Sequence, residues 1–315
     1  MDNLKVFSGN ATPDLAGKIA AYLEKPVGMA SVTRFPDGEI NVKVEEDVRG
    51  SDIFIVQSTC PPVNENFMEL VILIDCMKRA SAERITAVLP YFGYARKDRK
   101  DEGRVPITAK LAANLITKAG ADRVITVDLH AAQIQGFFDI PVDHLFASAV
   151  LGPYYQSLEI PDAVIVSPDV GSIKISRAYA ERLGAGLAVV DKRRTSPDAA
   201  EAGFLIGEVK GKNVIMVDDM ISTGGSIAEA AKLVAEHGAQ DIYVGATHGV
   251  FCGPAVERLS SAPIGQIAVT DTIPLPEGMS PMAGVVKELT ISKLLGEAIR
   301  RIHFNESVSS LFSGD

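Results

Sequence analysis

The sequence contains few cysteines and no long apolar run. Its three cysteines, Cys60, Cys76 and Cys252, are too few and too widely spaced for a disulfide framework or a metal cluster, and they predict reduced thiols in a cytoplasmic protein. The longest apolar run, around residues 70–74, is far too short to span a bilayer, and no basic and apolar N-terminal signal is visible. We therefore expect no membrane partner.

The chain has fewer basic residues, 31, than acidic ones, 40. The formal net charge is −9 and the isoelectric point is about 5.2, which argues against a nucleic-acid-binding surface. Local basic clusters can still bind phosphate ligands within an acidic chain. The hydrophobic fraction of 47% and the charged fraction of 23% are ordinary for a globular protein, and a length of 315 residues favours two domains over one core.

Short apolar runs alternate with helical patterns along the chain, which predicts an α/β fold with mostly parallel sheets flanked by helices. We expect two domains, residues 1–148 and 149–315, separated by a break near 147–158 that contains Gly152 and Pro153. The expected buried strands are residues 53–56, 85–89, 124–127, 164–166, 187–190, 214–217, 242–244 and 267–269. The expected helices are residues 66–80, 108–119, 172–183 and 227–237.

The stretch 214–226 combines a buried strand, two acids, a glycine turn and a helix start. We expect the strand to end directly before Asp218 and Asp219, and the helix to open with a capping box of Ser226 and Glu229. The N–H groups of the turn and the helix dipole attract phosphate, and the carboxylates can accept hydrogen bonds from vicinal hydroxyls. The stretch therefore predicts a sugar-phosphate site, with a solvated βα turn as the alternative.

Acids follow three of the expected strands, at Asp128, Asp169 and the pair Asp218 and Asp219. Ligands of open α/β sheets gather at the carboxyl ends of the strands, and converging carboxylates suit a magnesium ion shared with a phosphate substrate. His130 has two interpretations: a metal ligand, or a histidine packed at the strand end and bonded to a neighbouring carboxylate. Residue chemistry alone does not separate the two.

A basic segment follows the strand expected at 187–190. Its cations include Lys192 and Arg194, and the segment 195–203 after them has the composition of a mobile loop. Such cations could close over a polyphosphate and stabilise the charge that develops there. A solvated basic turn is the alternative.

Two further segments could contact a nucleotide. Residues 95–104 contain five cations and three anions, which is typical of an exposed loop, and the aromatic residues of 91–94 could face a base. Residues 34–39 form a turn by their Pro-Asp-Gly content. Phe35 in that turn could stack on a base, although a plain turn is the simpler interpretation.

Taken together, these segments resemble the ribose-phosphate pyrophosphokinases of the phosphate-activated class, also called phosphoribosyl pyrophosphate (PRPP) synthetases. The resemblance covers almost the whole chain. The stretch 217–226 is similar to the PRPP-binding loop that phosphoribosyltransferases share. The motifs that resemble the synthetases specifically are residues 34–39, 90–96, 126–130, 133–139, 167–169 and 191–194.

The resemblance implies two phosphoribosyltransferase-like domains, the first binding ATP and the second binding ribose 5-phosphate, with the last residues packed back on the first. It also implies transfer of the pyrophosphoryl group of Mg-ATP to the 1-hydroxyl of ribose 5-phosphate, giving PRPP and AMP. The implied ATP-binding residues are Phe35, Asp37, Gly38, Glu39, Arg96 and Lys97. The implied ribose 5-phosphate-binding residues are Asp218, Asp219, Ser222, Thr223, Gly224, Gly225 and Ser226.

The resemblance extends to metal binding, catalysis and regulation. His130 and Asp169 would hold Mg²⁺, and Lys192 and Arg194 would be the catalytic cations that close on the transferred group. The family is a homohexamer that phosphate activates and ADP inhibits, which implies self-association and a regulatory site. The implied regulatory residues are Arg49, Ser81, Ser307 and Ser309.

The chain departs from the resembled pattern at several positions. Ser172 stands where glycine is common, Ser222 where an acid is usual, Ser226 where threonine is usual and Lys97 where glutamine is common. Two rival hypotheses are a catalytically silent regulatory subunit and a phosphoribosyltransferase that consumes PRPP. The first should have lost the loop cations or the acid pair, and the second does not account for the ATP-side residues. An active synthetase is therefore the favoured hypothesis.

Overall fold

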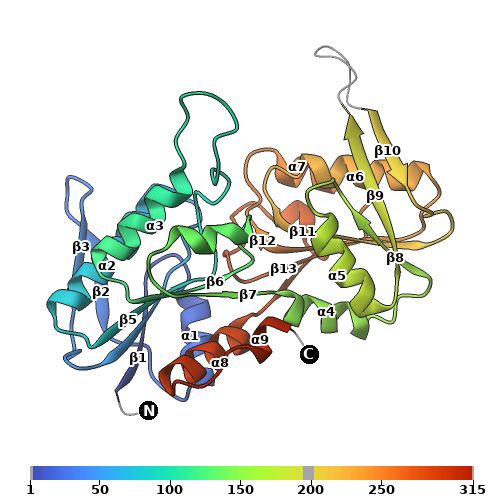
Figure 1. Ribbon diagram of the computed structural model, residues 1–315. Helices are drawn as coiled ribbons and strands as arrows, with labels where there is room; N and C mark the ends of the chain where they lie inside the picture. The colour runs from blue at the N-terminus through green and yellow to red at the C-terminus, as the bar shows by residue number, and fades with distance from the viewer. Residues whose placement is uncertain (1–2, 194–201, 314–315) are drawn as a thin grey trace. The chain divides into compact units, whose positions relative to one another are not determined.

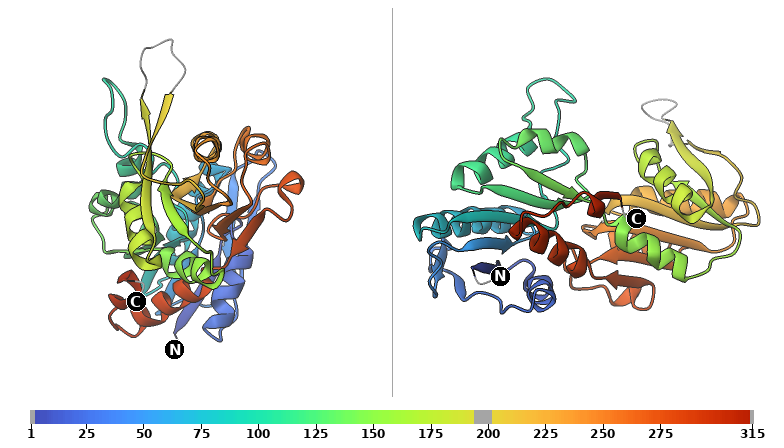
Figure 2. Two further views of the ribbon diagram at one scale, coloured as in Figure 1. Left: turned by 90° about the vertical axis from the view of Figure 1, so that its right-hand side faces the viewer. Right: turned by 60° about the horizontal axis from the view of Figure 1, so that its bottom comes forward.

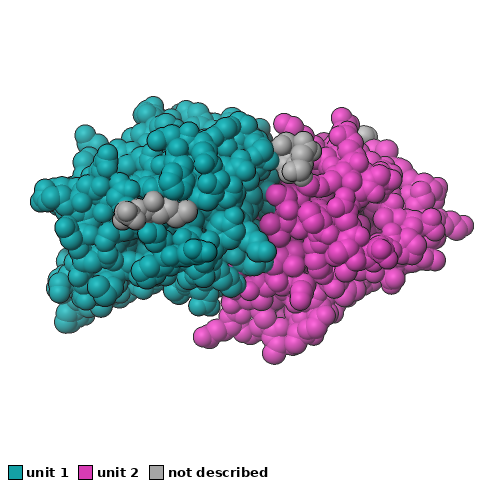
Figure 3. All heavy atoms as spheres, turned by 90° about the horizontal axis from the view of Figure 1, so that it is seen from below, with its two compact units in different colours: residues 1–147, 272–274, 290–315 teal, residues 148–271, 275–289 magenta. Residues whose placement is uncertain are grey.

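The structure is a computed structural model that describes residues 3–193 and 202–313 (Figure 1). The chain forms two compact units (Figure 3). Unit 1 comprises residues 1–147, 272–274 and 290–315, and unit 2 comprises residues 148–271 and 275–289. Each unit is a group of residues that contact one another, which does not test whether it is a domain. The predicted domains, 1–148 and 149–315, therefore stay a prediction.

Unit 1 is built on a five-stranded sheet in which all neighbouring strands are parallel. Its central strands are continuous apolar runs because helices cover both faces of the sheet. In sheet order the strands are β1 (Leu4–Ser8), β4 (Asp52–Val56), β5 (Arg84–Leu89), β6 (Arg123–Val127) and β7 (Val142–Leu145).

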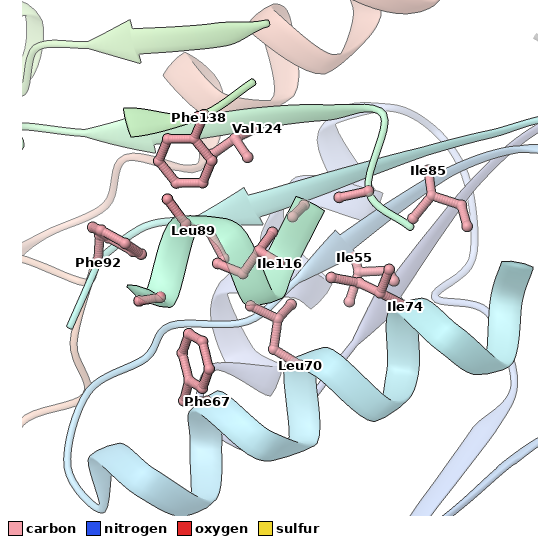
Figure 4. Packing of buried hydrophobic residues seen from close by; sticks show 14 of the residues in the cluster. Ile55, Phe67, Leu70, Ile74, Ile85, Leu89, Phe92, Ile116, Val124 and Phe138 are labelled. Carbon is pink, nitrogen blue, oxygen red and sulfur yellow. The ribbon is translucent and has the colours of Figure 1, made fainter. Parts of the chain in front are cut away.

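Two pairs of helices pack on opposite faces of this sheet (Figure 1). The pairs are α2 (Val63–Arg79) with α3 (Thr108–Ala119), and α1 (Pro13–Tyr22) with α8 (Ser292–His303). Figure 4 shows the first pair against the sheet, where Leu70 and Ile116 of the helices and Ile55 and Leu89 of the strands are fully buried. Side chains alternate along a strand, so Phe54 points to the other face.

Helix α8 belongs to unit 1, although most of unit 2 precedes it in the chain. It lies beside α1 (Figure 2). His303 Nδ1 lies 2.7 Å from Asp52 Oδ2, and Arg84 forms an ion pair with the same carboxylate. Arg84 also donates a hydrogen bond to the carbonyl of Ile302, so the end of α8 is tied to β4 and β5.

Smaller elements complete unit 1. The antiparallel hairpin of β2 (Ala30–Arg34) and β3 (Ile40–Val44) packs against α2 through Val32 and Val42. The remaining elements are the 3-10 helix η1 (Ala132–Phe137) and the short helix α9 (Ser310–Ser313).

Unit 2 is built on a seven-stranded sheet in which only the pair at one edge is antiparallel. In sheet order the strands are β10 (Ala202–Ile206), β9 (Gly186–Arg193), β8 (Ala163–Ser167), β11 (Asn213–Ile221), β12 (Ile242–Gly249), β13 (Gln266–Thr270) and β14 (Val286–Leu289). The helices are α4 (Ser148–Ser157), α5 (Ile173–Leu183), α6 (Gly225–Glu236), α7 (Ala255–Ser260) and the 3-10 helix η2 (Ser280–Met282). The segment 147–158, expected to contain the domain boundary, includes α4, which contains Pro153.

The predicted α/β fold with mostly parallel sheets is confirmed. Each expected strand lies within an observed strand, and each expected helix coincides with an observed one to within three residues at either end. Across residues 3–193 and 202–313, no helix is both long enough and apolar enough to cross a membrane.

Candidate functional site

The acid pair Asp218 and Asp219 lies inside β11, not after it. The strand was expected to end before the acids, but it continues to Ile221 because β12 extends beside it. Asp218 is paired with Ala246 of β12, whereas pairing with β8 on the other side stops at Met216. The carboxylates therefore sit on a fixed backbone where one neighbouring strand has already ended.

The loop after β11 leads directly into α6. Gly224 is the N-cap with a φ of +71°, a left-handed conformation that favours glycine, and α6 begins at Gly225. The predicted capping box at Ser226 is wrong, since the cap has no side-chain hydrogen bond. The first N–H groups of a helix lack intrahelical acceptors, so this helix start can receive an anion.

Three residues to which the sequence analysis gave no role in the site hold this loop or neighbour it. The Cys252 amide donates to the Ser222 carbonyl at 3.0 Å, and Cys252 Sγ lies 3.3 Å from Ser222 Oγ. Arg258 of α7 donates to the Thr223 carbonyl at 3.3 Å. Ser172, before α5, is the third. None is near the loop in sequence, so no local pattern could have identified them.

Ser172 joins two of the predicted carboxylates. Its Oγ lies 2.7 Å from Asp218 Oδ1 and 3.2 Å from Asp169 Oδ1. Its amide donates to the same Asp169 oxygen at 2.9 Å. The structure therefore brings Asp169, which follows β8, and Asp218, in β11, to one side chain at the carboxyl end of the sheet.

The crowding of acids changes the protonation of Asp218. Burial, and then the negative charge of Asp219, raises the pKa of the Asp218 carboxyl to about 7, and the charge of Asp169 adds to this. The hydrogen bond from Ser172 acts in the opposite direction because it favours the charged form. Asp218 therefore titrates near neutral pH.

Magnesium suits this donor set. Within the described part of the chain, no three His, Cys, Asp or Glu side chains are grouped to hold a metal by themselves. Magnesium usually takes one or two carboxylates and completes its shell with water and substrate phosphates, so the Asp169 carboxylate beside Ser172 fits as a ligand.

His130 lies in unit 1 and Asp169 in unit 2. His130 is exposed after β6, so it is not packed in the core, and its role as a metal ligand stays a prediction. The turn before it is fixed by His144 Nε2, which accepts a hydrogen bond from the Leu129 amide at 2.9 Å. Asp128 there has a φ of +37° and accepts a hydrogen bond from the Ala147 amide.

The predicted turn at 34–39 is the tip of the β2–β3 hairpin. Phe35 is 49% exposed, and its backbone hydrogen bonds to Glu39 and Gly38 close the turn. Gly38 has a φ of +94°, and the Glu39 amide donates to Asp37 Oδ1. The tip therefore presents an aromatic ring and two acids.

The segment at 91–97 was expected to offer aromatic rings to a base and exposed cations to a nucleotide, and it matches this only in part. Tyr91 and Phe92 are buried, and Phe92 packs against Phe138, so these two aromatic rings do not face a base. Arg96 and Lys97 are exposed, and Lys97 forms an ion pair with Asp101 at 3.1 Å.

The predicted catalytic cations lie at the edge of the described residues. The backbone of Lys192 is in β9, paired with Gly203 of β10. Arg194 lies outside the described residues.

The predicted regulatory residues form two local groups in unit 1. The Gly50 amide, next to Arg49, donates to the Ser81 carbonyl at 3.0 Å. Ser307 Oγ donates to Ser309 Oγ at 3.0 Å in the exposed segment after α8. The regulatory role of these four residues stays a prediction.

Comparison with known proteins identifies the family. Sequence models match at residues 4–120 (the N-terminal domain of ribose phosphate pyrophosphokinase), 143–255 (the phosphoribosyl transferase domain) and 202–313 (the phosphoribosyl synthetase-associated domain). The chain is 58% identical to the ribose-phosphate pyrophosphokinase of Rhodopirellula baltica over 99% of both chains. The chain belongs to the ribose-phosphate pyrophosphokinase family.

Two other members of this family are also similar to the chain along almost its whole length. The Bacillus subtilis ribose-phosphate pyrophosphokinase is 50% identical, over 99% of this chain and 98% of its own. The crystal structure of phosphoribosylpyrophosphate synthetase from Mycobacterium smegmatis matches with a TM-score of 0.90 and 43% identity, over 96% of this chain and 99% of that one. The predicted family, the ribose-phosphate pyrophosphokinase activity and the phosphoribosyltransferase-like fold are confirmed.

Proposed function

We propose that this pyrophosphokinase positions ribose 5-phosphate at the β11–α6 loop and Mg-ATP at the β2–β3 hairpin and the segment at 96–97. The observation that carries the proposal is that Asp218 and Asp219 precede a helix start whose amides are available to an anion. The two carboxylates accept the ribose hydroxyls, and residues 222–226 hold the 5-phosphate. The 1-hydroxyl oxygen then bonds to the β-phosphorus of ATP, the bond from that phosphorus to the oxygen shared with the α-phosphate breaks, AMP leaves with this oxygen, and the hydroxyl proton passes to solvent.

On the ATP side, Phe35 provides a stacking surface for the base. Its exposure at the hairpin tip supports this role. Asp37, Gly38 and Glu39 form the rest of the tip. The exposed side chains of Arg96 and Lys97 supply positive charge to the nucleotide.

His130 of unit 1 and Asp169 of unit 2 would each serve as a Mg²⁺ ligand, and the metal would supply positive charge to the phosphates. Phosphoryl transfer depends mainly on positioning and charge stabilisation. Lys192 and Arg194 supply positive charge to the transferred group. The position of Lys192 at the end of β9 supports this role.

The proposals for regulation and assembly rest on membership of the same family. We assign phosphate activation and ADP inhibition to Arg49, Ser81, Ser307 and Ser309, and a homohexamer to the assembled enzyme. Three free cysteines support a reducing, cytoplasmic location.

The direct test incubates the full chain with ATP, Mg²⁺ and ribose 5-phosphate, with and without inorganic phosphate. Equimolar AMP and PRPP are expected. If neither product exceeds the background, the proposed substrate sites are wrong.

A further inference from the structure

Ser172 occupies a position that the reaction described above does not use. Its side chain is 6% exposed, at the N-cap of α5, where it makes no capping hydrogen bond. Its hydroxyl instead lies between Asp218 Oδ1 and Asp169 Oδ1, at 2.7 and 3.2 Å. A local helix cap therefore does not explain this hydroxyl.

The two carboxylates are held in different ways. Asp218 is on β11, whose backbone is fixed by pairing with β12. Asp169 is in a turn, where it also accepts a hydrogen bond from the Ser172 amide. A hydroxyl has one proton to donate, so the shorter contact marks Asp218 as its acceptor, and Asp169 is held mainly by the amide.

We propose that Ser172 is a positioning residue that couples ribose 5-phosphate binding at Asp218 to magnesium binding at Asp169. The inference rests on the roles proposed for these two acids. A metal that orients Asp169 also orients the Ser172 amide and hydroxyl, and through them Asp218. Coupling of this kind is reciprocal, so each ligand strengthens binding of the other by the same factor.

The test measures ribose 5-phosphate binding to the full chain by calorimetry, with Mg²⁺ and without it. The ratio of the two dissociation constants is the coupling factor. In Ser172→Ala and Ser172→Gly, which keep the amide but lose the hydroxyl, we expect the factor to fall by roughly tenfold, the scale of a lost hydrogen bond to a charged group. Ser172→Thr should restore it.

Ser176→Ala is the matched control. Ser176 lies one turn further along α5, is fully buried, and its hydroxyl has no hydrogen-bond partner among the described residues. Its loss should leave the coupling factor unchanged. A merely structural role for Ser172 would alter melting temperature in the variants without altering this ratio.

The outcomes separate the two proposals. A wild-type enzyme that binds no ribose 5-phosphate and forms no AMP overturns the proposed function, and this inference with it. Wild-type AMP formation, together with a coupling factor that Ser172→Ala changes by less than twofold, overturns the inference alone.

Discussion

His303 of α8 and Asp52 of β4 are hydrogen-bonded at 2.7 Å although they are 251 positions apart in the chain. The Asp52 side chain is 6% exposed and also forms an ion pair with Arg84. Its hydrogen bond is the first cause of the raised pKa of Arg84. This carboxylate therefore anchors the C-terminal helix to the sheet of unit 1.

Replacing Asp52 with asparagine should lower the free energy of unfolding by about 2 kcal/mol, because the partly buried Arg84 loses its hydrogen bonds to a charged partner. Urea unfolding monitored by circular dichroism measures the loss. Asp75→Asn is the control, since Asp75 pairs with Arg79 on an exposed helix surface and should change little. Equal effects of the two variants would contradict the anchoring role.

Asp218→Asn should stabilise the metal-free protein at pH 8 while it weakens ribose 5-phosphate binding. The folded-state pKa of about 7 lies above the ordinary value of 3.8, so ionisation opposes folding. The gain, on the order of 4 kcal/mol, should be complete above pH 7 and vanish as pH falls to about 4. Urea unfolding of both proteins across this range checks it. A gain that is constant with pH would contradict this titration.

Gly224→Ala should destabilise the protein by about 1 kcal/mol and raise the KM for ribose 5-phosphate. The φ of +71° strains any other residue, and an added Cβ would lie 3.0 Å from Leu259 Cγ. Gly17→Ala is the control, because a Cβ at this position in α1 meets nothing within 4 Å and should stabilise the helix. Thermal unfolding and steady-state kinetics measure the two effects. An unchanged KM would show that the loop tolerates a different backbone.

Lys192→Ala should lower kcat much more than it weakens binding of either substrate, because its charge is proposed to act on the transferred group. Steady-state kinetics and equilibrium binding measure the two quantities separately. Proportional losses in turnover and affinity would indicate ground-state binding instead.

The sequence predicted the buried strands because continuous apolar runs such as those of β4 and β11 are strong signals. It did not predict the β2–β3 hairpin as strands, since its residues are only partly buried and lack such a run. The prediction ended β11 too early because Asp218 is polar. In the structure, Asp218 pairs with Ala246 and the strand continues. Tertiary pairing outweighed local composition there.

The candidate site was predicted in part. Asp169, Asp218 and Asp219 were found because each follows or continues an apolar run. The contact of Ser172 with Asp218 spans 46 positions and depends on how α5 approaches the sheet, so no local pattern contains it. The burial of Tyr91 and Phe92 likewise depends on packing partners elsewhere in the chain.

The late position of α8 in the chain affects how unit 1 folds during translation. A ribosome releases residues 148–271 before α8, so unit 2 can begin to fold while the sheet of unit 1 still lacks a helix on one face. Until α8 emerges, the apolar surface that it covers is open to aggregation or to chaperones. Unit 1 can therefore finish folding only after residues near the end of the chain have been translated.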